Sequence, residues 1–222
     1  MSYQDFMSVL HKSTSRDYLA RVNEPGFPKG KCAELAKKWD YDYWDGDRRI
    51  NYGGYRYISG RWERVAQAMI DYYQLPKNAK ILDIGCGKGF LLRDFKLLLP
   101  EAEVIGIDIS SYAIENGHPD VIDKLINGNC TSLPWGDQYF DLAISINTFH
   151  NLYNYELEMA IREIQRVANN KYICVESYAT EQQKANLLYW QVTCESFCNP
   201  KEWDWWFNHC GYTGDHSFIY FD

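Results

Sequence analysis

The chain has 222 residues and a formal net charge of −7, and its composition is 46% hydrophobic and 24% charged, which suits one folded domain with or without an extension. No run of Lys or Arg forms a basic stripe that could follow phosphates, so a nucleic-acid partner is not expected. No apolar stretch reaches the roughly 18 residues of a membrane span, and the first ten residues lack a signal-peptide pattern. We therefore expect a cytoplasmic protein with no membrane partner.

Seven cysteines are spread along the chain, an odd number that is typical of reduced thiols in a cytoplasmic protein. Cys194, Cys198, His209 and Cys210 have the residue types of a zinc site. Their spacing matches no common zinc pattern, however, so we expect no metal site.

Before residue 75 the pattern predicts no clear strand. It predicts short helices at residues 3–22 and 31–39. A segment dense in Tyr, Asp, Arg and Gly follows at residues 41–60, and an amphipathic helix at residues 61–73. We expect residues 1–75 to form a helical extension with an aromatic lid, and residues 76–222 to form the ligand-binding domain.

From Lys80 onward, buried strands alternate with helices. Strands are predicted at residues 81–84, 104–109, 124–128, 140–146, 172–177 and 217–221. Helices are predicted at residues 90–99, 111–116, 120–126, 155–168, 181–193 and 200–210. This alternation predicts an α/β fold with a doubly wound, mostly parallel sheet of about six or seven strands.

The loop after the first of these strands is the main functional signal. Gly85-Cys86-Gly87-Lys88-Gly89 leads directly into a helix, where glycines let the backbone approach a ligand and the helix start presents free N–H groups. A dinucleotide site would have Gly-x-Gly-x-x-Gly, one residue longer. Asp83 before the loop would repel a pyrophosphate but would suit an ammonium group.

The next strand ends at Asp108, which could accept hydrogen bonds from both ribose hydroxyls of a nucleoside. Asp108 could instead cap the helix that follows, although Ser110 suits that role better. Together, Asp83 and Asp108 favour a nucleoside that carries a zwitterionic tail.

Four segments in order resemble class I S-adenosylmethionine-dependent methyltransferases, over residues 80 to about 178. They are Leu82–Gly89, Ile105–Ser110, Gly128–Trp135 and Phe140–Ser145 followed by Asn147–His150. The resemblance implies a Rossmann-like methyltransferase domain over residues 76–222, with S-adenosylmethionine as the cofactor and S-adenosylhomocysteine as its product.

The resemblance also implies roles for single residues. The methionine part of the cofactor would face Asp83, Gly85, Cys86, Gly87 and Gly89. Asp108 would hold the ribose and Ile109 would pack on the adenine. Asn129 and Cys130 would lie at the adenine edge, unless they are plain loop residues, and Asn147 would close the site near the sulfonium.

Two departures from the family pattern stand out. Asn129 replaces the Asp that is common in the family, which weakens the expected contact with the adenine amino group. Only one strand follows Gly211, where the family has a hairpin, so we expect six strands rather than seven.

The predicted catalytic residues are His150, Glu176 and Tyr52, and the predicted substrate contacts are Tyr55, Tyr57, Arg61 and Tyr178. His150 has a pKa suited to a base near neutrality, unless it is a surface loop residue. Glu176 could bind a cationic or hydroxyl-bearing acceptor, or only form a salt bridge. The tyrosines could shield the sulfonium or only cover the sheet edge, and Arg56 or Arg61 could hold a carboxylate.

We expect a small-molecule methyl acceptor and a monomer or homodimer. A protein of the same fold that only senses the cofactor, or uses it for other chemistry, is an alternative, as is a protein methyltransferase. The tight loop and Asp83 argue against a nicotinamide- or flavin-dependent oxidoreductase, and the missing basic stripe argues against an RNA substrate.

Overall fold

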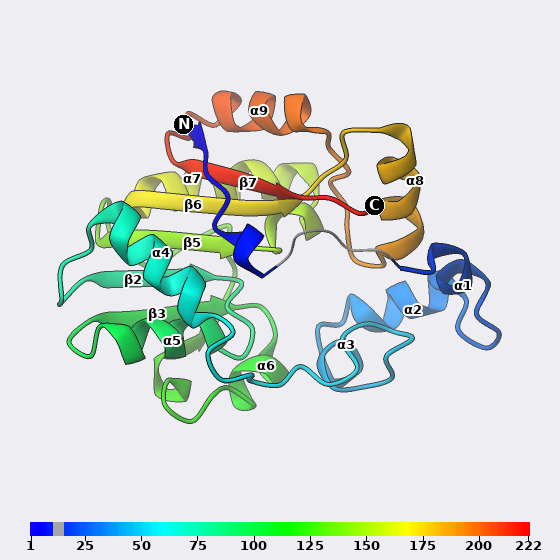
Figure 1. The fold of residues 1–222 in the computed structure, drawn as a ribbon, viewed down its shortest axis with the longest axis horizontal. Helices are drawn as coiled ribbons and strands as arrows, with labels where there is room; N and C mark the ends of the chain where they lie inside the picture. Colours follow the sequence, from blue (N-terminus) through cyan, green and yellow to red (C-terminus); the bar gives the residue numbers. More distant parts are fainter. Residues whose placement is uncertain (11–15) are drawn as a thin grey trace.

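The computed structural model describes residues 1–10 and 16–222, and its centre is a parallel sheet between two layers of helices (Figure 1). Seven strands lie in the order β1-β7-β6-β5-β2-β3-β4, and every neighbouring pair is parallel. The strands are β1 Ser2–Tyr3, β2 Lys80–Ile84, β3 Glu103–Asp108, β4 Leu125–Asn127, β5 Phe140–Ile146, β6 Ala168–Glu176 and β7 Asp215–Ile219.

Helices connect and cover these strands. The α-helices are α1 Tyr18–Asn23, α2 Lys29–Ala36, α3 Tyr41–Trp44, α4 Glu63–Tyr73, α5 Phe90–Leu98, α6 Ser111–Glu115, α7 Asn154–Val167, α8 Glu181–Trp190 and α9 Pro200–His209. Three short 3₁₀ turns are η1 Met7–Val9, η2 Ile122–Lys124 and η3 Phe149–Asn151. None of the helices within residues 1–10 and 16–222 is both long and apolar enough to cross a membrane.

Both faces of the sheet are apolar because helices cover both of them. Successive side chains of β2 point to opposite faces, so Ile81 packs in the cluster formed with α4 and α5, and Leu82 packs in the cluster formed with α7 and α9. Trp203 and Phe207 of α9 are fully buried in the second cluster. The helical pattern of α9 therefore serves mainly to bury these two rings.

The strands predicted from residue 80 onward are all present, with ends shifted by a few residues. The expectation of six strands was wrong, because Ser2–Tyr3 pairs with Asp215–His216 as a seventh, edge strand. A strand of only two residues carries no periodic pattern, and a helix was expected to begin at Tyr3 instead. Part of that expected helix, residues 11–15, lies outside the described residues, and α1 accounts for its end.

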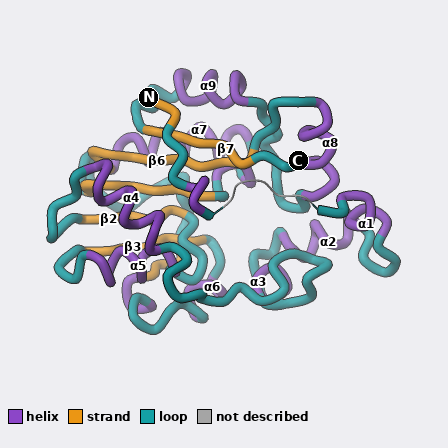
Figure 2. The backbone as a smooth tube through the Cα atoms, in the orientation of Figure 1, coloured by secondary structure: helices purple, strands orange, loops and turns teal. Residues whose placement is uncertain are grey.

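The segment 16–62, called the cap below, lies beyond the carboxyl ends of the strands (Figures 1 and 2). Its own apolar cluster includes Tyr43 and Trp44 and extends to Ala113 of α6 and Val192 after α8. The side chain of Lys37 also forms an ion pair with Glu195. The cap is thus attached to both sides of the sheet's carboxyl edge, where ligands bind in open α/β folds.

Candidate active site

The glycine loop turns tightly at the carboxyl end of β2. The backbone N–H groups of Gly85 and Cys86 both donate to the carbonyl of Ile107, at 2.8 and 3.2 Å. Gly87 has φ +54°, and a Cβ there would lie 2.8 Å from the ring of Trp44. Only glycine allows both this backbone conformation and this close approach of the cap.

Gly89 has a different role from the one predicted. It is the N-cap of α5, and a Cβ on it would meet the side chains of Leu125 and Val121, at 2.9 and 3.1 Å. It does not line the cavity described below. Gly89 therefore allows the helix start to pack against the β4 side of the sheet, and contact with a ligand is left to Gly85 and Gly87.

Two buried carboxyl groups stand beside the loop. Asp108 accepts hydrogen bonds from the backbone N–H of Gly87 at 2.7 Å and of Ser110 at 2.8 Å. Burial, and then the charge of Asp108, raise the pKa of Asp83 to about 7. No hydrogen-bond partner or cation contacts the Asp83 carboxyl within the described chain, so a bound ammonium group would relieve an unfavourable buried charge.

The alternative role of Asp108 as a helix cap is wrong. Ser110 caps α6, because its Oγ accepts from the N–H of Ala113 at 3.0 Å. Asp108 instead accepts from the glycine loop through Oδ2 and lies on the wall of the cavity described below.

A cavity of about 720 Å³ lies between the carboxyl edge of the sheet and the cap. Among the residues that line it are most of those predicted from the sequence: Tyr52, Tyr55, Arg61, Asp83, Gly85, Cys86, Gly87, Asp108, Ile109, Asn129, Cys130, Asn147, His150 and Glu176. Its volume falls within the range of about 300 to 1,000 Å³ that is common for sites of small ligands.

Tyr57 and Tyr178 were predicted as substrate contacts, but the structure places both outside this cavity. The hydroxyl of Tyr57 donates to Asp94 at 2.5 Å. Tyr178 points to Glu202, at 3.5 Å, and lies under Lys184. Tyr57 anchors the aromatic segment to α5, and Tyr178 is buried in the apolar cluster that covers one face of the sheet, so neither lines this cavity.

The cap closes the cavity with stacked aromatic rings. Trp44 stacks on Tyr52 with ring centroids 5.5 Å apart, and Tyr55 stacks on Phe90 at 4.9 Å. Desolvation raises the pKa of Tyr52 to about 12, so its phenol is neutral and can act as a hydrogen-bonding group but not as a base near neutral pH.

An ion pair joins the cap to the glycine loop, and sequence reasoning missed it. Lys88 Nζ lies 2.6 Å from Asp45 Oδ2 and also donates to the carbonyl of Tyr55 at 3.0 Å. Asp45 further accepts from the hydroxyl of Tyr112 at 2.8 Å. Lys88 is 6% exposed. Nothing in the sequence distinguishes Asp45 from the other acids near it, so only the fold identifies this contact.

Glu176, at the end of β6, is the strongest candidate for a catalytic base. Burial raises the pKa of its carboxyl to about 8, and a hydrogen bond from the Gln191 side-chain amide to Oε2 opposes that rise. No Lys or Arg in the described chain lies within ion-pair distance, so the salt-bridge alternative is wrong. Gln191, which follows α8, was not predicted because its contact with Glu176 arises only in the fold.

His150 is 1% exposed, so it is not a surface loop residue. Its Nδ1 accepts from the backbone N–H of Glu176 at 3.3 Å, which places the ring proton on Nε2, 3.5 Å from Glu176 Oε2. Burial lowers the pKa of His150 to about 3. The neutral ring is therefore placed to orient Glu176, and its low pKa makes it a weaker candidate than Glu176 for the base predicted at this position.

The cavity wall at the end of β5 carries an unpaired polar group. Asn147 has φ +57°, its N–H donates to Cys174 at 2.9 Å, and its buried Oδ1 has no partner within the described residues. Buried acceptors are normally paired, so this oxygen is available to a ligand donor. By contrast, the Oδ1 of Asn129 is already bound by Thr131 at 2.9 Å, and burial raises the pKa of Cys130 to about 12, which keeps its thiol protonated.

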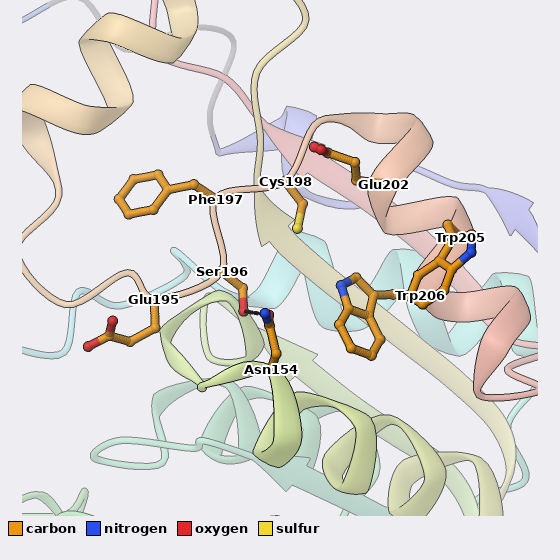
Figure 3. A pocket seen from close by; sticks show the side chains of 8 residues that line it. All are labelled: Asn154, Glu195, Ser196, Phe197, Cys198, Glu202, Trp205 and Trp206. Carbon is orange, nitrogen blue, oxygen red and sulfur yellow. Dashed lines mark hydrogen bonds between the residues drawn. The ribbon is translucent and has the colours of Figure 1, made fainter.

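A second hollow of about 390 Å³ lies between α9 and the start of α7 (Figure 3). Its walls include Cys198, Trp205 and Trp206, and Ser196 donates to Asn154 across it at 3.3 Å. The Oγ of Ser196 also lies 2.8 Å from the carbonyl of Leu152. These polar groups already bond one another, so the larger cavity is the candidate active site.

Comparison with known proteins agrees with this geometry. Residues 82–175 match the model of a family described as "Methyltransferase domain". The match covers less than half of the 222-residue chain, so it shows that this part of the chain is similar to a methyltransferase domain. The matched region runs from β2 to β6 and contains the glycine loop, Asp108 and His150, while the cap lies outside it.

Among curated relatives, a malonyl-[acyl-carrier protein] O-methyltransferase of Legionella pneumophila is 31% identical over 40% of this chain and 32% of its own length. A tRNA (carboxymethyluridine(34)-5-O)-methyltransferase of Arabidopsis thaliana is 32% identical over 58% of this chain and 30% of its own. A demethylmenaquinone methyltransferase of Symbiobacterium thermophilum is 29% identical over 54% of this chain and 51% of its own length. The matches thus cover about a third to a half of these relatives.

Solved structures resemble this chain in fold. The YcgJ protein of Bacillus subtilis aligns with a TM-score of 0.54 at 20% identity, over 65% of this chain and 66% of its own. A SAM-dependent methyltransferase of Archaeoglobus fulgidus aligns with a TM-score of 0.53 at 19% identity, over 68% of each chain. At these identities the likeness concerns the fold alone.

Proposed function

We propose that the chain transfers the methyl group of S-adenosylmethionine to a small-molecule acceptor inside the 720 Å³ cavity. One observation carries the proposal. The same cavity has the glycine loop with Asp83 and Asp108 on one part of its wall, and Glu176 with its two donors on another part. The proposal therefore places the cofactor and the proton acceptor in one cavity.

The residues present fit the cofactor. Asp83, with its raised pKa, suits the ammonium group, and Asp108 suits the ribose hydroxyls, since each carboxylate oxygen can accept more than one hydrogen bond. Ile109, 55% exposed on the cavity wall, offers an apolar surface for the base. When bound, the cofactor supplies an electrophilic methyl group on a sulfonium.

The chain's own part in the reaction is alignment, exclusion of water and removal of one proton. The acceptor's hydroxyl or amine gives its proton to the carboxylate of Glu176, while the acceptor atom bonds to the methyl carbon and the carbon–sulfur bond breaks. Nε2–H of His150 and the amide of Gln191 both face Oε2 of Glu176. They keep the carboxylate in one orientation, and the aromatic rings of the cap limit the access of water.

A small acceptor is favoured over RNA or protein for two reasons. The net charge of −7 opposes a polyanionic substrate, although one relative is named for action on tRNA. The cap also lies over part of the cavity and is attached to the glycine loop through Asp45 and Lys88, which leaves a partly covered site of small-molecule size instead of a long open groove.

The test is to incubate the protein with S-[methyl-¹⁴C]adenosylmethionine and a cell extract separated into small molecules, protein and RNA. We expect label in the small-molecule fraction only. Glu176→Gln should reduce the rate about 100-fold or more, as expected for loss of a general base, while S-adenosylhomocysteine still binds. Label in protein or RNA, or no transfer at all, would contradict the proposal.

A further inference from the structure

Two arginines of the cap line the cavity beside Trp190, the last residue of α8. The guanidinium carbon of Arg16 lies 4.3 Å from the centre of the Trp190 ring, and that of Arg48 lies 5.7 Å from it. All three residues belong to the cavity wall. Two positive charges therefore share one aromatic surface inside the proposed active site.

Neither arginine has a carboxylate partner. The salt bridges found among residues 1–10 and 16–222 include neither Arg16 nor Arg48, and residues 11–15 contain no Asp or Glu. Arg48 uses one amine on the carbonyl of Asn51. Most of the donors of both guanidiniums remain available, although a chain with 30 acidic residues could easily have supplied a counter-ion.

A neighbouring arginine provides the contrast. Arg21 also lies over Trp190, at 5.6 Å, but its two terminal amines donate to the carbonyls of Arg49 and Ile50. Arg21 thus holds the cap backbone together. Within the described residues Arg16 makes no such hydrogen bond, and the pKa of its guanidinium is lowered by burial and then by the charge of Arg48. Two like charges held together in this way are stabilised when an anion joins them.

The position of the pair relates it to the acceptor and not to the cofactor. The charge of Arg16 acts on Glu176, whose pKa it lowers, whereas Asp83 and Arg61 both act on Tyr55 near the glycine loop. The carboxylate of a zwitterionic cofactor would lie on the Asp83 side, where Arg61 is available. Arg16 and Arg48 lie on the Glu176 side, where the acceptor would have to be.

We infer that Arg16 and Arg48, over the ring of Trp190, bind a carboxylate or phosphate group of the methyl acceptor. This inference rests on the proposed function and specifies its substrate class: an anionic small molecule whose hydroxyl or amine reaches Glu176. Guanidinium groups suit both oxyanions because they donate two parallel hydrogen bonds. The two arginines would thereby fix the distance between the anionic group and the nucleophile.

Calorimetric titration with inorganic phosphate and, separately, with succinate tests the subsite without knowledge of the acceptor. We expect at least one probe to bind the wild-type protein, and Arg16→Gln/Arg48→Gln to weaken that binding tenfold or more. Arg64→Gln is the matched control, since Arg64 is exposed on α4 and outside the cavity. If the double variant does not fold, the single variant Arg48→Gln replaces it, because the Arg48 side chain is exposed. This single variant should weaken binding of the probe severalfold.

The preferred probe distinguishes a phosphate from a carboxylate acceptor. Binding of neither probe, or equal binding to the double variant and the control, would overturn the inference. The charge of the ¹⁴C-labelled product is a second readout: an anionic product is retained on an anion-exchange column, and a neutral or cationic product would also overturn it. Anion binding without any methyl transfer would instead count against the proposed function and support the subsite.

Discussion

Asp83→Asn should stabilise the ligand-free protein and at the same time impair cofactor binding. The Asp83 side chain is 5% exposed and makes no hydrogen bond within the described residues, so an amide of the same size fits its place. Burial and the charge of Asp108 raise its pKa from 3.8 to about 7. A shift of roughly three pKa units corresponds to about 4 kcal/mol of folding free energy that is lost when the group ionises.

The sign of the pH dependence follows from the raised pKa. The folded chain binds the Asp83 proton more tightly than the unfolded chain does. The stabilisation of the fold by protonated Asp83 is therefore complete below pH 4 and is lost as the pH rises through about 7. Asp83→Asn removes this dependence. The variant should therefore gain up to about 4 kcal/mol over the wild type at pH 8, and about half as much at pH 5.5.

Urea unfolding at pH 5.5 and pH 8 measures the stability, and calorimetry measures the affinity for S-adenosylhomocysteine. In the wild type, the ligand's ammonium group should expel the Asp83 proton, so titrations at pH 6.5 in buffers of different ionisation enthalpy should show proton release. The variant should show none, and weaker binding. Asp123→Asn, at an exposed residue paired with Lys124, is the control. A variant that is less stable at pH 8, or that binds normally, would refute the reasoning.

Further predictions concern the base and the cap. Gln191→Met removes the amide that donates to Glu176, so the pKa of Glu176 should rise above its present value of about 8 and the pH–rate profile should shift to higher pH. An unchanged profile would show that Gln191 does not position the base. Asp45→Asn leaves the buried ammonium of Lys88 without its counter-ion, so chemical denaturation should show a loss of about 1–3 kcal/mol, and an unchanged midpoint would argue against this contact as an anchor of the cap.

The sequence allowed the central sheet to be predicted because its signals are local. Short apolar runs such as Ile81–Ile84 alternate with amphipathic helices, and this order alone indicates a parallel sheet. The edge strand Ser2–Tyr3 could not be predicted, because two residues have no periodicity and their pairing depends on β7, more than 200 residues later. The number of strands was mispredicted for the same reason, because this edge strand is the seventh.

The part of the cavity around the glycine loop was predictable for a similar reason. Asp83, Gly85 and Gly87 are consecutive or nearly so, and Asp108 ends the strand adjacent to β2, so their proximity follows from the fold class. The part of the cavity around Glu176 combines residues from distant segments. Glu176 accepts a hydrogen bond from Gln191 and shares the cavity wall with Arg16 of the cap, and no spacing in the sequence reveals that these three residues line one cavity.

His150 shows where residue type misleads. A histidine after a strand at the carboxyl edge has the right chemistry for a base, but here the N–H of Glu176 occupies its Nδ1 and burial keeps it neutral. Burial and hydrogen-bond direction decide the role, and neither can be read from the residue type.

Calorimetric titration with S-adenosylhomocysteine, on the wild type and on Asp108→Ala, tests the central claim most directly. The account predicts one site per chain in the wild type and affinity about 100-fold weaker or worse in Asp108→Ala, because two hydrogen bonds to a charged group are lost. Thermal unfolding of the ligand-free variant should remain cooperative. Absence of binding to the wild type, or equal affinity in a folded Asp108→Ala variant, would contradict the assignment of this cavity as the cofactor site.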